Sequence, residues 1–274
     1  MTGTVLDMFD LHGRVALVSG GSQGLGRAMA LAFAEAGADL VLPTHSNAAG
    51  VKDTAEQAKK LGRRVRVVTP GDMTNVDHIR AAFRIVDEEF GRIDILGAVA
   101  GPGFRCSAEE IELEKFQQVV MGLTVARFCC CQEAGRRMLK QGRGSIINIG
   151  SLASISALGR GNFAYSVGMG AVVQMTRELS TEWSSRGVRV NAILPGQVTN
   201  PGLQGYWAAE PAIRDRMLSG IPMGRFGMPD DIKGLALWLA SDASAWITGA
   251  LIPFDGGNLA MNAGGTAGPY KPVS

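Results

Sequence analysis

The sequence predicts an α/β fold built around one doubly wound parallel sheet of about seven strands, with helices on both faces. Short segments rich in Val, Ile and Leu alternate with segments of helical periodicity from residue 14 to about residue 255. The short segments are apolar at almost every position, as in strands that are covered on both faces of a parallel sheet. No repeat or change of composition divides the 274 residues, so we expect a single domain over residues 1–274.

Each expected strand is a short run of mainly apolar residues. In chain order the strands are expected at residues 14–19, 39–42, 65–69, 93–98, 145–149, 189–194 and 252–254. Each expected helix repeats its apolar residues every three or four positions, and glycine follows most of them because it adopts the left-handed conformation that ends helices. The helices are expected at residues 25–36, 50–61, 76–90, 113–140 and 165–185. Such a doubly wound (Rossmann-type) sheet binds its ligands at the carboxyl ends of the strands.

Two segments interrupt this alternation. Residues 197–223 are rich in Gly, Pro and aromatic residues, and we expect them to form a mobile lid over the site. The large side chains of the lid form either an apolar wall of the pocket or the core of the lid itself: Tyr206, Trp207, Met217 and Met223. The tail over residues 258–274 is rich in Gly and Pro and is expected either to be loose or to pack on a neighbouring subunit.

Composition and charge exclude several classes of function. Hydrophobic residues make up 46% of the chain and charged residues 19%, as in soluble globular enzymes. The net charge is only +2, and Lys and Arg are scattered, so we expect no nucleic-acid or membrane-surface patch. Residues 1–9 lack the features of a signal peptide, and no segment reaches the roughly 20 apolar residues of a membrane span. We therefore expect a cytoplasmic protein that acts on a small molecule.

The cysteines and histidines predict no metal site. Neighbouring residues on a helix point about 100° apart, so consecutive cysteines suit neither a metal cage nor a framework of disulfides. We expect this run to be small, buried side chains in a reducing compartment: Cys129, Cys130 and Cys131. The histidines have no spacing typical of a metal site or a catalytic triad: His12, His45 and His78.

A glycine-rich turn, Gly-Gly-Ser-Gln-Gly-Leu-Gly at residues 20–26, lies between the first expected strand and the first expected helix. Glycine lets the backbone approach a pyrophosphate closely, and the helix that follows offers free N–H groups and a partial positive charge. A plain tight turn would also explain the glycines, but their position between strand and helix favours a dinucleotide site. The expected cofactor-binding residues of the turn are Gly20, Ser22, Gln23, Gly24, Leu25 and Gly26.

Further motifs follow the turn in order. They are Gly71-Asp72-Met73 and residues 91–96, 189–196, 225–227, 247–249 and 255–257. Together with the turn, whose spacing is Gly-x-x-x-Gly-x-Gly, they resemble the short-chain dehydrogenase/reductase family over residues 9–258. The resemblance implies a nicotinamide cofactor with further contacts at Asp72, Met73, Ala100, Gly101, Tyr165, Pro195, Gly196 and Val198. It also implies a homotetramer that packs through the two long helices near residues 113–140 and 165–185.

The choice between NAD and NADP depends on the residues after the second strand. An acidic residue there hydrogen-bonds the 2′-hydroxyl of the ribose, whereas Arg there accommodates a 2′-phosphate. This chain has Pro43-Thr44-His45-Ser46, with no carboxylate to repel a phosphate and with donors on Thr44, His45 and Ser46. We therefore favour NADP, with His45 as a contact; NAD, or an ordinary polar loop, is the alternative.

The resemblance implies a catalytic pair, Ser151 and Tyr165. Ser151 follows the fifth strand and Tyr165 lies near the start of a helix, so both fall at the carboxyl edge of the sheet. By resemblance, Tyr165 is the acid/base and Ser151 hydrogen-bonds the substrate carbonyl. The chemistry needs a proton on oxygen as hydride reaches carbon, and a phenol beside a hydroxyl can deliver one. The alternative is a loop serine and a tyrosine at the edge of the core.

Three positions depart from the family pattern. Met169 stands where the family has its lysine, Leu123 where it has a catalytic asparagine, and residues 98–101 read Ala-Val-Ala-Gly instead of Asn-Asn-Ala-Gly. By resemblance, the lysine holds the nicotinamide ribose and lowers the pKa of the tyrosine, and the asparagine holds a water that feeds protons to the lysine. With apolar residues in both places, the phenol should keep its proton, with a pKa at or above about 10. We therefore expect hydride transfer to run mainly as a reduction, and slowly.

Two arginines are candidate contacts near the site. Arg127 lies four residues after Leu123 on the same helical face. It either reaches the space vacated by the lysine or is a solvated or interface residue, and we favour the second interpretation. Arg105, beyond the fourth strand, either contacts an acidic substrate or is an exposed loop residue, and we again favour the second.

The residues support three functions. The favoured one is an NAD(P)-dependent oxidoreductase that acts on a carbonyl or an activated C=C bond with atypical proton delivery. The second is a non-redox enzyme on the same scaffold, which would catalyse elimination or dehalogenation with Ser151 and Tyr165. Halohydrin dehalogenases resemble the family in this way, but they have lost the glycine turn, which is intact here. The third is a catalytically silent cofactor-binding subunit that pairs with an active relative.

Overall fold

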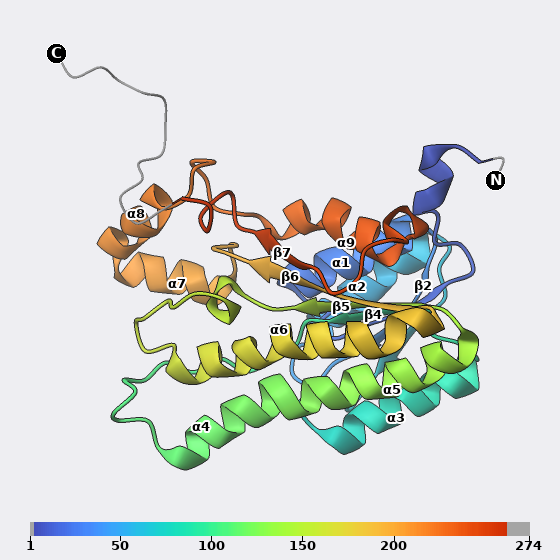
Figure 1. Cartoon of the computed structure of the whole chain (residues 1–274), viewed down its shortest axis with the longest axis horizontal. Coiled ribbons are helices and arrows are strands. Elements are labelled where there is room, and N and C mark those ends of the chain that lie inside the picture. Colours follow the sequence, from blue (N-terminus) through green and yellow to red (C-terminus); the bar gives the residue numbers. More distant parts are fainter. Residues whose placement is uncertain (1–2, 262–274) are drawn as a thin grey trace.

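Seven parallel strands form one sheet in the order β3-β2-β1-β4-β5-β6-β7 (Figure 1). The computed structural model describes residues 3–261. The strands are β1 (Val15–Val18), β2 (Asp39–Pro43), β3 (Val65–Val68), β4 (Ile95–Ala98), β5 (Gly144–Ile149), β6 (Val188–Pro195) and β7 (Leu251–Phe254). Every neighbouring pair is parallel, and the strand order reverses between β1 and β4. The doubly wound sheet is therefore confirmed, and a ligand crevice is expected at this reversal, outside the carboxyl ends of the strands.

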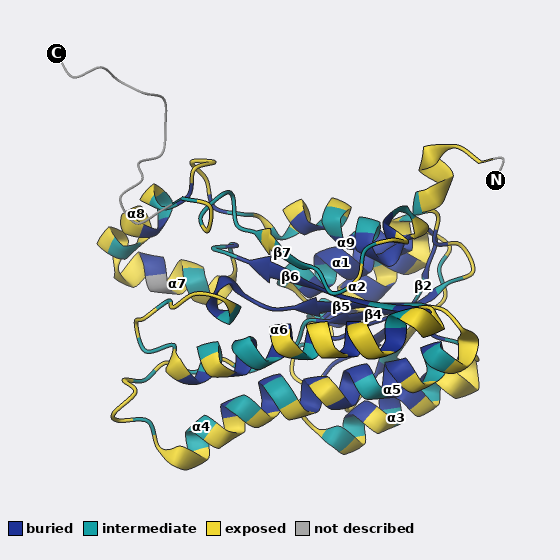
Figure 2. Cartoon of the chain, in the orientation of Figure 1, coloured by how far each residue is buried: buried dark blue, intermediate teal, exposed yellow. Residues whose placement is uncertain are grey.

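Helices cover both faces of the sheet, as Figure 1 shows. One face carries α1 (Gly24–Glu35), α2 (Ala48–Lys60) and α9 (Lys233–Ala240), and the other carries α3 (Val76–Glu89), α4 (Leu113–Val120), α5 (Ala126–Gln141) and α6 (Phe163–Trp183). Successive strand residues point to opposite faces. Val15 and Leu17 accordingly belong to one buried cluster, and Ala16 and Val18 to the other. Figure 2 shows that the strands lie between these layers, which explains why most of their residues are apolar. No helix within residues 3–261 is both long and apolar enough to cross a membrane.

The helical stretch expected over residues 113–140 is present, but a π-helical turn interrupts it. This turn, Met121–Val125 (η2), joins α4 to α5. It contains the fully buried Leu123 and also Gly122, where a Cβ would come within 2.7 Å of the Pro102 ring. A π-helical turn adds one residue to a helical turn and is frequent at functional sites. The extra residue changes which side chains of α5 face the sheet, a change that helical periodicity does not predict.

The segment after β6 folds into two short helices with a small core of their own. α7 (Pro201–Ala209) and α8 (Pro211–Ser219) lie beyond the carboxyl ends of the strands (Figure 1). The Trp207 and Phe226 rings lie 4.0 Å apart between centroids, and the Trp207 indole N–H donates to the Met217 sulfur at 3.2 Å. Trp207 is therefore a core residue of this segment. The side chain of Tyr206, and the part of the expected tail beyond residue 261, lie outside the described residues.

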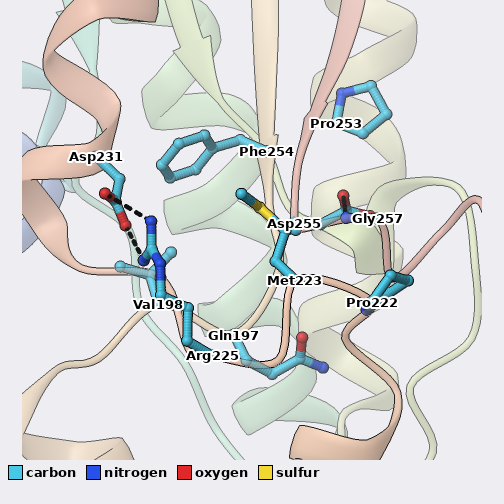
Figure 3. Close-up of a pocket in the computed structure, with 12 residues that line it drawn as sticks. Gln197, Val198, Pro222, Met223, Arg225, Asp231, Pro253, Phe254, Asp255 and Gly257 are labelled. Atoms are coloured by element: carbon cyan, nitrogen blue, oxygen red, sulfur yellow. Dashed lines mark hydrogen bonds and ion pairs between the residues drawn. The ribbon is translucent and has the colours of Figure 1, made fainter. Parts of the chain in front are cut away.

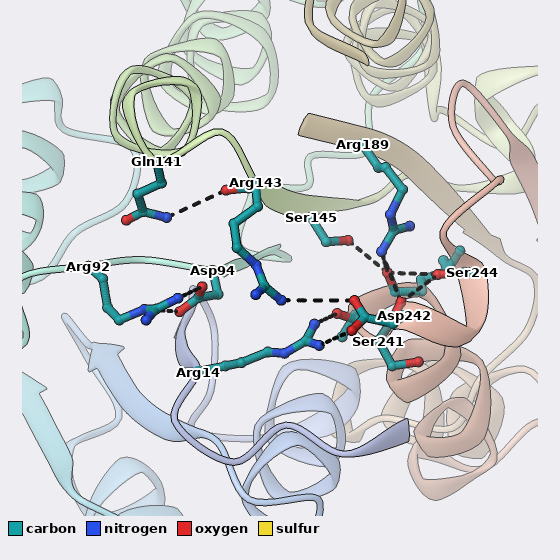
Figure 4. Close-up of polar contacts among 12 residues, drawn as sticks. Arg14, Arg92, Asp94, Gln141, Arg143, Ser145, Arg189, Ser241, Asp242 and Ser244 are labelled. Carbon is teal, nitrogen blue, oxygen red and sulfur yellow. Dashed lines mark hydrogen bonds and ion pairs between the residues drawn. The ribbon is translucent and has the colours of Figure 1, made fainter. Parts of the chain in front are cut away.

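At the amino ends of the strands, polar side chains hold the end of α9 to the sheet (Figure 4). The Arg189 guanidinium donates to the carbonyls of Leu239 at 2.8 Å and Ser241 at 3.1 Å. The Ser145 hydroxyl also donates to the Leu239 carbonyl, at 2.7 Å. The last carbonyls of a helix have no partner within the helix, so these contacts satisfy them. The network anchors α9 to β5 and β6 at the edge opposite the glycine turn.

The three consecutive cysteines lie on α5 and are buried, as the sequence predicts. All four cysteines of the chain are free thiols. Burial raises the pKa of Cys131 to about 12 and raises that of Cys130 well above its usual value, because removal from water disfavours the thiolate. These thiols stay protonated, and their role is packing.

Candidate active site

The glycine turn joins the end of β1 to α1 at the carboxyl edge of the sheet. Gly20 (φ 72°) and Gly24 (φ 54°) adopt left-handed backbone conformations, which glycine reaches without strain. A Cβ at Gly26 would lie 2.2 Å from the Gly20 carbonyl oxygen, so the first turn of α1 can pack this closely only without a side chain. The start of α1, with its unpaired N–H groups, lines a cavity at this edge. These features suit a phosphate group, and the residues present therefore fit a dinucleotide.

This cavity has a volume of about 400 Å³, and most of the expected cofactor-binding residues line it. The expected residues among its walls are Gly20, Ser22, Gln23, Gly24, Leu25, Gly26, Ala100, Gly101, Tyr165, Pro195, Gly196 and Val198. Ser19, which the sequence did not single out, joins the ends of β1 and β4. Its hydroxyl accepts hydrogen bonds from the backbone N–H groups of Val99 at 2.8 Å and Ala100 at 3.0 Å. Residues between positions 20 and 201 thus meet in one crevice at the reversal of strand order.

Three other expected contacts, His45, Asp72 and Met73, lie outside that cavity. His45 follows β2, and Asp72 and Met73 follow β3, the neighbouring strand. Burial acts to raise the pKa of Asp72, but hydrogen bonds from Thr74 and the charge of nearby His45 outweigh it, so the pKa is lowered. The Asp72 carboxylate is therefore ionised near His45. These residues form a separate group at the ends of β2 and β3, and their assignment to the adenosine end stays an expectation.

Ser151 and Tyr165 lie together beside the cavity. Ser151 follows β5 and precedes a short 3-10 turn, Leu152–Ser154 (η3), where its hydroxyl accepts from the Ala153 N–H at 3.2 Å. Tyr165 lies in the first turn of α6, and its phenol is hydrogen-bonded with Ser151. Burial raises the pKa of Tyr165, while the Ser151 hydrogen bond and the charge of Arg127 lower it only in part. The phenol is therefore protonated at neutral pH.

Apolar side chains fill the space one turn further along α6. Met169 and Leu123 are buried in one cluster with three other apolar residues. Leu123 fits between two glycines, because a Cβ would lie 2.5 Å from it at Gly101 and 2.8 Å from it at Gly168. Met169 also lines the 400 Å³ cavity. None of the side chains in this cluster can take up or release a proton as an ammonium group does.

Arg127 is buried, so the solvated position favoured from the sequence is wrong. Arg127 is only 3% exposed, and its Nε atom has no hydrogen-bond partner among residues 3–261. The guanidinium donates to the carbonyls of Ala98, of Ile149 at 3.0 Å and of Ala100 at 2.9 Å. Burial lowers the pKa of Arg127, yet its positive charge lies close enough to Tyr165 to act on the phenol. The side chain thus points to the ends of β4 and β5, whereas Met169 itself lies in the apolar cluster.

A second cavity, of about 600 Å³, shares Ser151 and Tyr165 with the first. Its other walls come from the loop after β4, the loop before α6 and the segment with α7 and α8. Arg105 is exposed, as expected, but it also lines this cavity, together with Arg160 and Met217. Arg160 was not among the expected site residues. Ser151 and Tyr165 therefore stand where a cavity suited to a dinucleotide meets a cavity suited to a small substrate.

A third cavity, of about 660 Å³, lies beside the end of β7 (Figure 3). Arg225 pairs there with Asp231, with N···O distances of 2.6 and 3.1 Å, and Met223 and Phe254 add apolar surface. Met223 therefore does not belong to the walls of the cavity that contains Tyr165. We do not assign this third cavity to the reaction.

The chain combines a parallel doubly wound sheet, a glycine turn where the strand order reverses, and a phenol and a hydroxyl beside the cavity at that point. This combination is typical of dinucleotide-dependent oxidoreductases. Comparison with known proteins agrees. A family model described as enoyl-(acyl carrier protein) reductase matches residues 20–258. The crystal structure of a short-chain type dehydrogenase/reductase from Mycobacterium marinum is 32% identical, with a TM-score of 0.83, and the match covers 93% of this chain and 99% of that one. The chain belongs to the short-chain dehydrogenase/reductase family of NAD(P)-dependent enzymes.

Two curated relatives differ in the substrates that their names give. The 2-dehydro-3-deoxy-D-gluconate 5-dehydrogenase of Dickeya dadantii (strain 3937) is 38% identical over 258 residues, which cover 93% of this chain and 99% of the relative. The D-threitol dehydrogenase of Mycolicibacterium smegmatis (strain ATCC 700084 / mc(2)155) is 39% identical over 251 residues, which cover 91% and 94%. The first name contains an acid and the second a neutral polyol.

Proposed function

We propose that the chain reduces the carbonyl group of a small molecule with NADPH, with Tyr165 as proton donor and Ser151 as hydrogen-bond donor to the carbonyl oxygen. One observation carries the proposal: both side chains line both cavities, the one suited to the dinucleotide and the one suited to the substrate. A carbonyl that enters the second cavity meets the phenol and the hydroxyl at the boundary with the first.

The proposed catalytic roles of Ser151 and Tyr165 follow from the chemistry of their side chains. When bound, the nicotinamide supplies a hydride to the carbonyl carbon. Ser151 holds the carbonyl oxygen, and Tyr165 transfers its phenolic proton to that oxygen. The raised pKa of Tyr165 supports this direction, because reduction needs the neutral phenol and oxidation needs the phenolate. The positive charge of Arg127 stabilises the phenolate that remains after the transfer.

The apolar packing around Met169 supports slow turnover. Met169 and Leu123 occupy the positions at which, by resemblance, the family keeps its proton relay. With these side chains in place, the phenolate must regain its proton from water by another route. At neutral pH, a phenol with a pKa above about 10 is ionised in fewer than about one molecule in 10³, so alcohol oxidation is slower still.

NADP is the proposed coenzyme, held by the glycine turn and the loop after β2. The turn at residues 20–26 would bind the pyrophosphate, and Thr44, His45 and Ser46 would donate to a 2′-phosphate. His45 and Ser46 are exposed and accessible to such a group. By resemblance, Asp72 and Met73 contact the adenine.

We also propose a homotetramer. Exposed apolar residues follow one face from the π-helical turn into α5, at Met121, Val125 and Phe128, each between 40 and 53% exposed. Two more lie on the neighbouring α6, at Phe163 and Val167. Apolar faces of this kind are typical of subunit contacts. Light scattering coupled to size-exclusion chromatography tests the proposal, and a monomer would contradict it.

The lid and the location of the protein are further parts of this proposal. Because α7 and α8 have a core of their own, with Trp207 at its centre, we propose that residues 197–223 move as one unit when substrate enters.

The four free cysteines support a reducing, cytoplasmic location.

The test of the function has two stages. Fluorescence titration with NADPH and NADH measures coenzyme binding, and NADPH oxidation over a panel of ketones measures turnover. Tyr165→Phe and Ser151→Ala should each lower kcat at least about 10²-fold while the enzyme still binds NADPH, because they remove the proton donor or the oxygen contact. Ser185→Ala, at an exposed position beyond α6, serves as the matched control and should have no effect.

The outcomes separate the three functions. Binding followed by turnover that depends on Tyr165 supports the oxidoreductase. An enzyme that binds neither coenzyme would refute it and leave the non-redox alternative. An enzyme that binds NADPH but reduces no ketone in the panel would also refute it and favour the silent cofactor-binding subunit.

A further inference from the structure

The second cavity has a charge pattern that the proposed function does not use. Two arginines, Arg105 and Arg160, line it, and none of the described residues in its walls is an aspartate or glutamate. We propose that Arg105 and Arg160 together bind the carboxylate of the substrate, so that the enzyme acts on a hydroxyl-bearing carbonyl acid in preference to a neutral polyol or ketose. This inference rests on the proposed function for the reacting carbonyl.

The loops that carry the two arginines contact each other through their backbones. Cys106, the residue after Arg105, pairs with Asn162 in an isolated parallel bridge, and its N–H donates to the Gly161 carbonyl at 3.0 Å. A Cβ at Gly161 would lie 3.0 Å from the Cys106 backbone, so glycine permits this approach. Arg105 directly precedes Cys106, and Arg160 directly precedes Gly161. Both arginines therefore lie next to the same backbone contact at the edge of the cavity.

The backbone at Arg160 is unusual. It has φ 55°, in the left-handed region, and the glycines on both sides have φ 64° and 71°. A non-glycine residue in this conformation is held there by its surroundings, and such residues concentrate at functional sites. Here the Asn162 side chain donates to the Gly159 carbonyl at 2.7 Å and to the Arg160 carbonyl at 3.3 Å, which fixes the turn. The structure thus holds an arginine on the cavity wall in a conformation that glycine would adopt more easily.

The chemistry of the walls matches a hydroxy acid. A guanidinium group presents a planar set of donors that matches the two oxygens of a carboxylate. The amide side chains that line the same cavity can donate to and accept from substrate hydroxyls: Asn162, Gln197 and Asn200. A neutral polyol would use the amides but would offer no carboxylate to the guanidinium groups. The names of the relatives leave the choice between acid and polyol open, and the arginines favour the acid.

Binding of D-gluconate and D-glucitol tests the inference, because the two molecules differ only in a carboxylate against a CH₂OH group. Isothermal titration of each into the enzyme saturated with NADP⁺ should give a Kd for D-gluconate at least about tenfold below that for D-glucitol. Arg105→Gln and Arg160→Gly should each weaken D-gluconate binding by about 10- to 100-fold and leave D-glucitol binding unchanged. Glycine is chosen at 160 because it keeps the left-handed backbone while it removes the charge.

Arg84→Gln, at an exposed position on α3, is the matched control and should change neither affinity. Equal affinity of the wild-type enzyme for the two molecules would overturn the inference. So would retention of D-gluconate affinity in both Arg105→Gln and Arg160→Gly. Either result would leave the proposed function intact if Tyr165-dependent ketone reduction persists. If D-gluconate binds and both variants weaken it, while no ketone is reduced, the proposed function fails and the carboxylate site stands.

Discussion

The substitution Met169→Lys would place an ammonium group one helical turn after the Tyr165 phenol. Residues four apart on a helix have Cβ atoms about 5–6 Å apart on the same face. Met169 lines the 400 Å³ cavity, so a lysine of similar length can bring its charged end to that cavity while its methylene groups stay in the apolar cluster. The variant therefore tests whether an ammonium group at this position lowers the pKa of Tyr165, which burial raises.

The size of the effect follows from the electrostatics. At a separation of about 5 Å and an effective dielectric constant of about 20, two unit charges interact by roughly 3 kcal/mol. This interaction lowers the pKa of the phenol by about two units. The fraction of phenolate at neutral pH, and with it the rate of alcohol oxidation, should rise about 100-fold. Reduction should change much less, because the neutral phenol stays the majority form below pH 8.

The assay measures kcat in both directions from about pH 6 to pH 10 for the ketone reduced fastest in the panel and its alcohol. In the wild type, the raised pKa of Tyr165 predicts that oxidation rises about tenfold per pH unit through this range, while reduction stays nearly flat. Met169→Lys should shift the oxidation profile down by about two pH units.

Met169→Leu is the control, since it changes the side chain but adds no charge. Ultraviolet difference absorbance against Tyr165→Phe variants reports the phenol pKa directly, without a substrate. An unshifted oxidation profile and an unshifted phenol pKa in a folded Met169→Lys enzyme that binds NADPH would refute the reasoning.

Other perturbations test the turn, the buried arginine, the distant network and the exposed helix face. Gly26→Ala should weaken NADPH binding at least about tenfold in a fluorescence titration, because its Cβ would lie 2.2 Å from the Gly20 carbonyl oxygen; unchanged binding would remove the turn from the coenzyme site. Arg127→Met should lower the free energy of unfolding in urea by about 3 kcal/mol, since buried carbonyls lose their donor; a loss below about 0.5 kcal/mol would contradict this. Arg189→Met should lower the free energy of unfolding by about 2 kcal/mol in the same measurement and leave the Kd for NADPH unchanged. A higher Kd would instead show that this network affects coenzyme binding at the opposite edge of the sheet. Phe128→Asp should lower the molar mass seen by light scattering, and an intact tetramer would place the subunit contact elsewhere.

The parts of the molecule that local sequence patterns determine were predictable. The strands were recognisable because helices cover both faces of the sheet, so most strand residues are apolar. The turn at residues 20–26 was recognisable because its requirements are local: Gly26 packs against the Gly20 backbone, and Gly20 and Gly24 adopt left-handed conformations. Ser151 and Tyr165 could be placed at the carboxyl edge because parallel strands end there, although their roles came from the family resemblance.

The parts that depend on distant contacts were not predictable. Arg127 is buried because carbonyls at the ends of β4 and β5 face it, and neither strand signals this in its own sequence. Arg160 reaches the cavity through a turn fixed by the loop after β4. The only local sign was the pair of glycines that flank it. The eight residues of α9 are almost all apolar and show no periodicity, so this helix had no counterpart among those expected.

The reactivity of the cysteine thiols reports when the helix layer separates from the sheet. Cys106 is partly accessible in the loop next to Arg105, whereas the three cysteines of α5 are shielded by the sheet. A thiol-reactive dye should therefore label the folded enzyme once per chain, and substrates that contact Arg105 should slow that labelling. Further labelling should begin only when α5 separates from β4 and β5, so its rate measures how often the layers come apart.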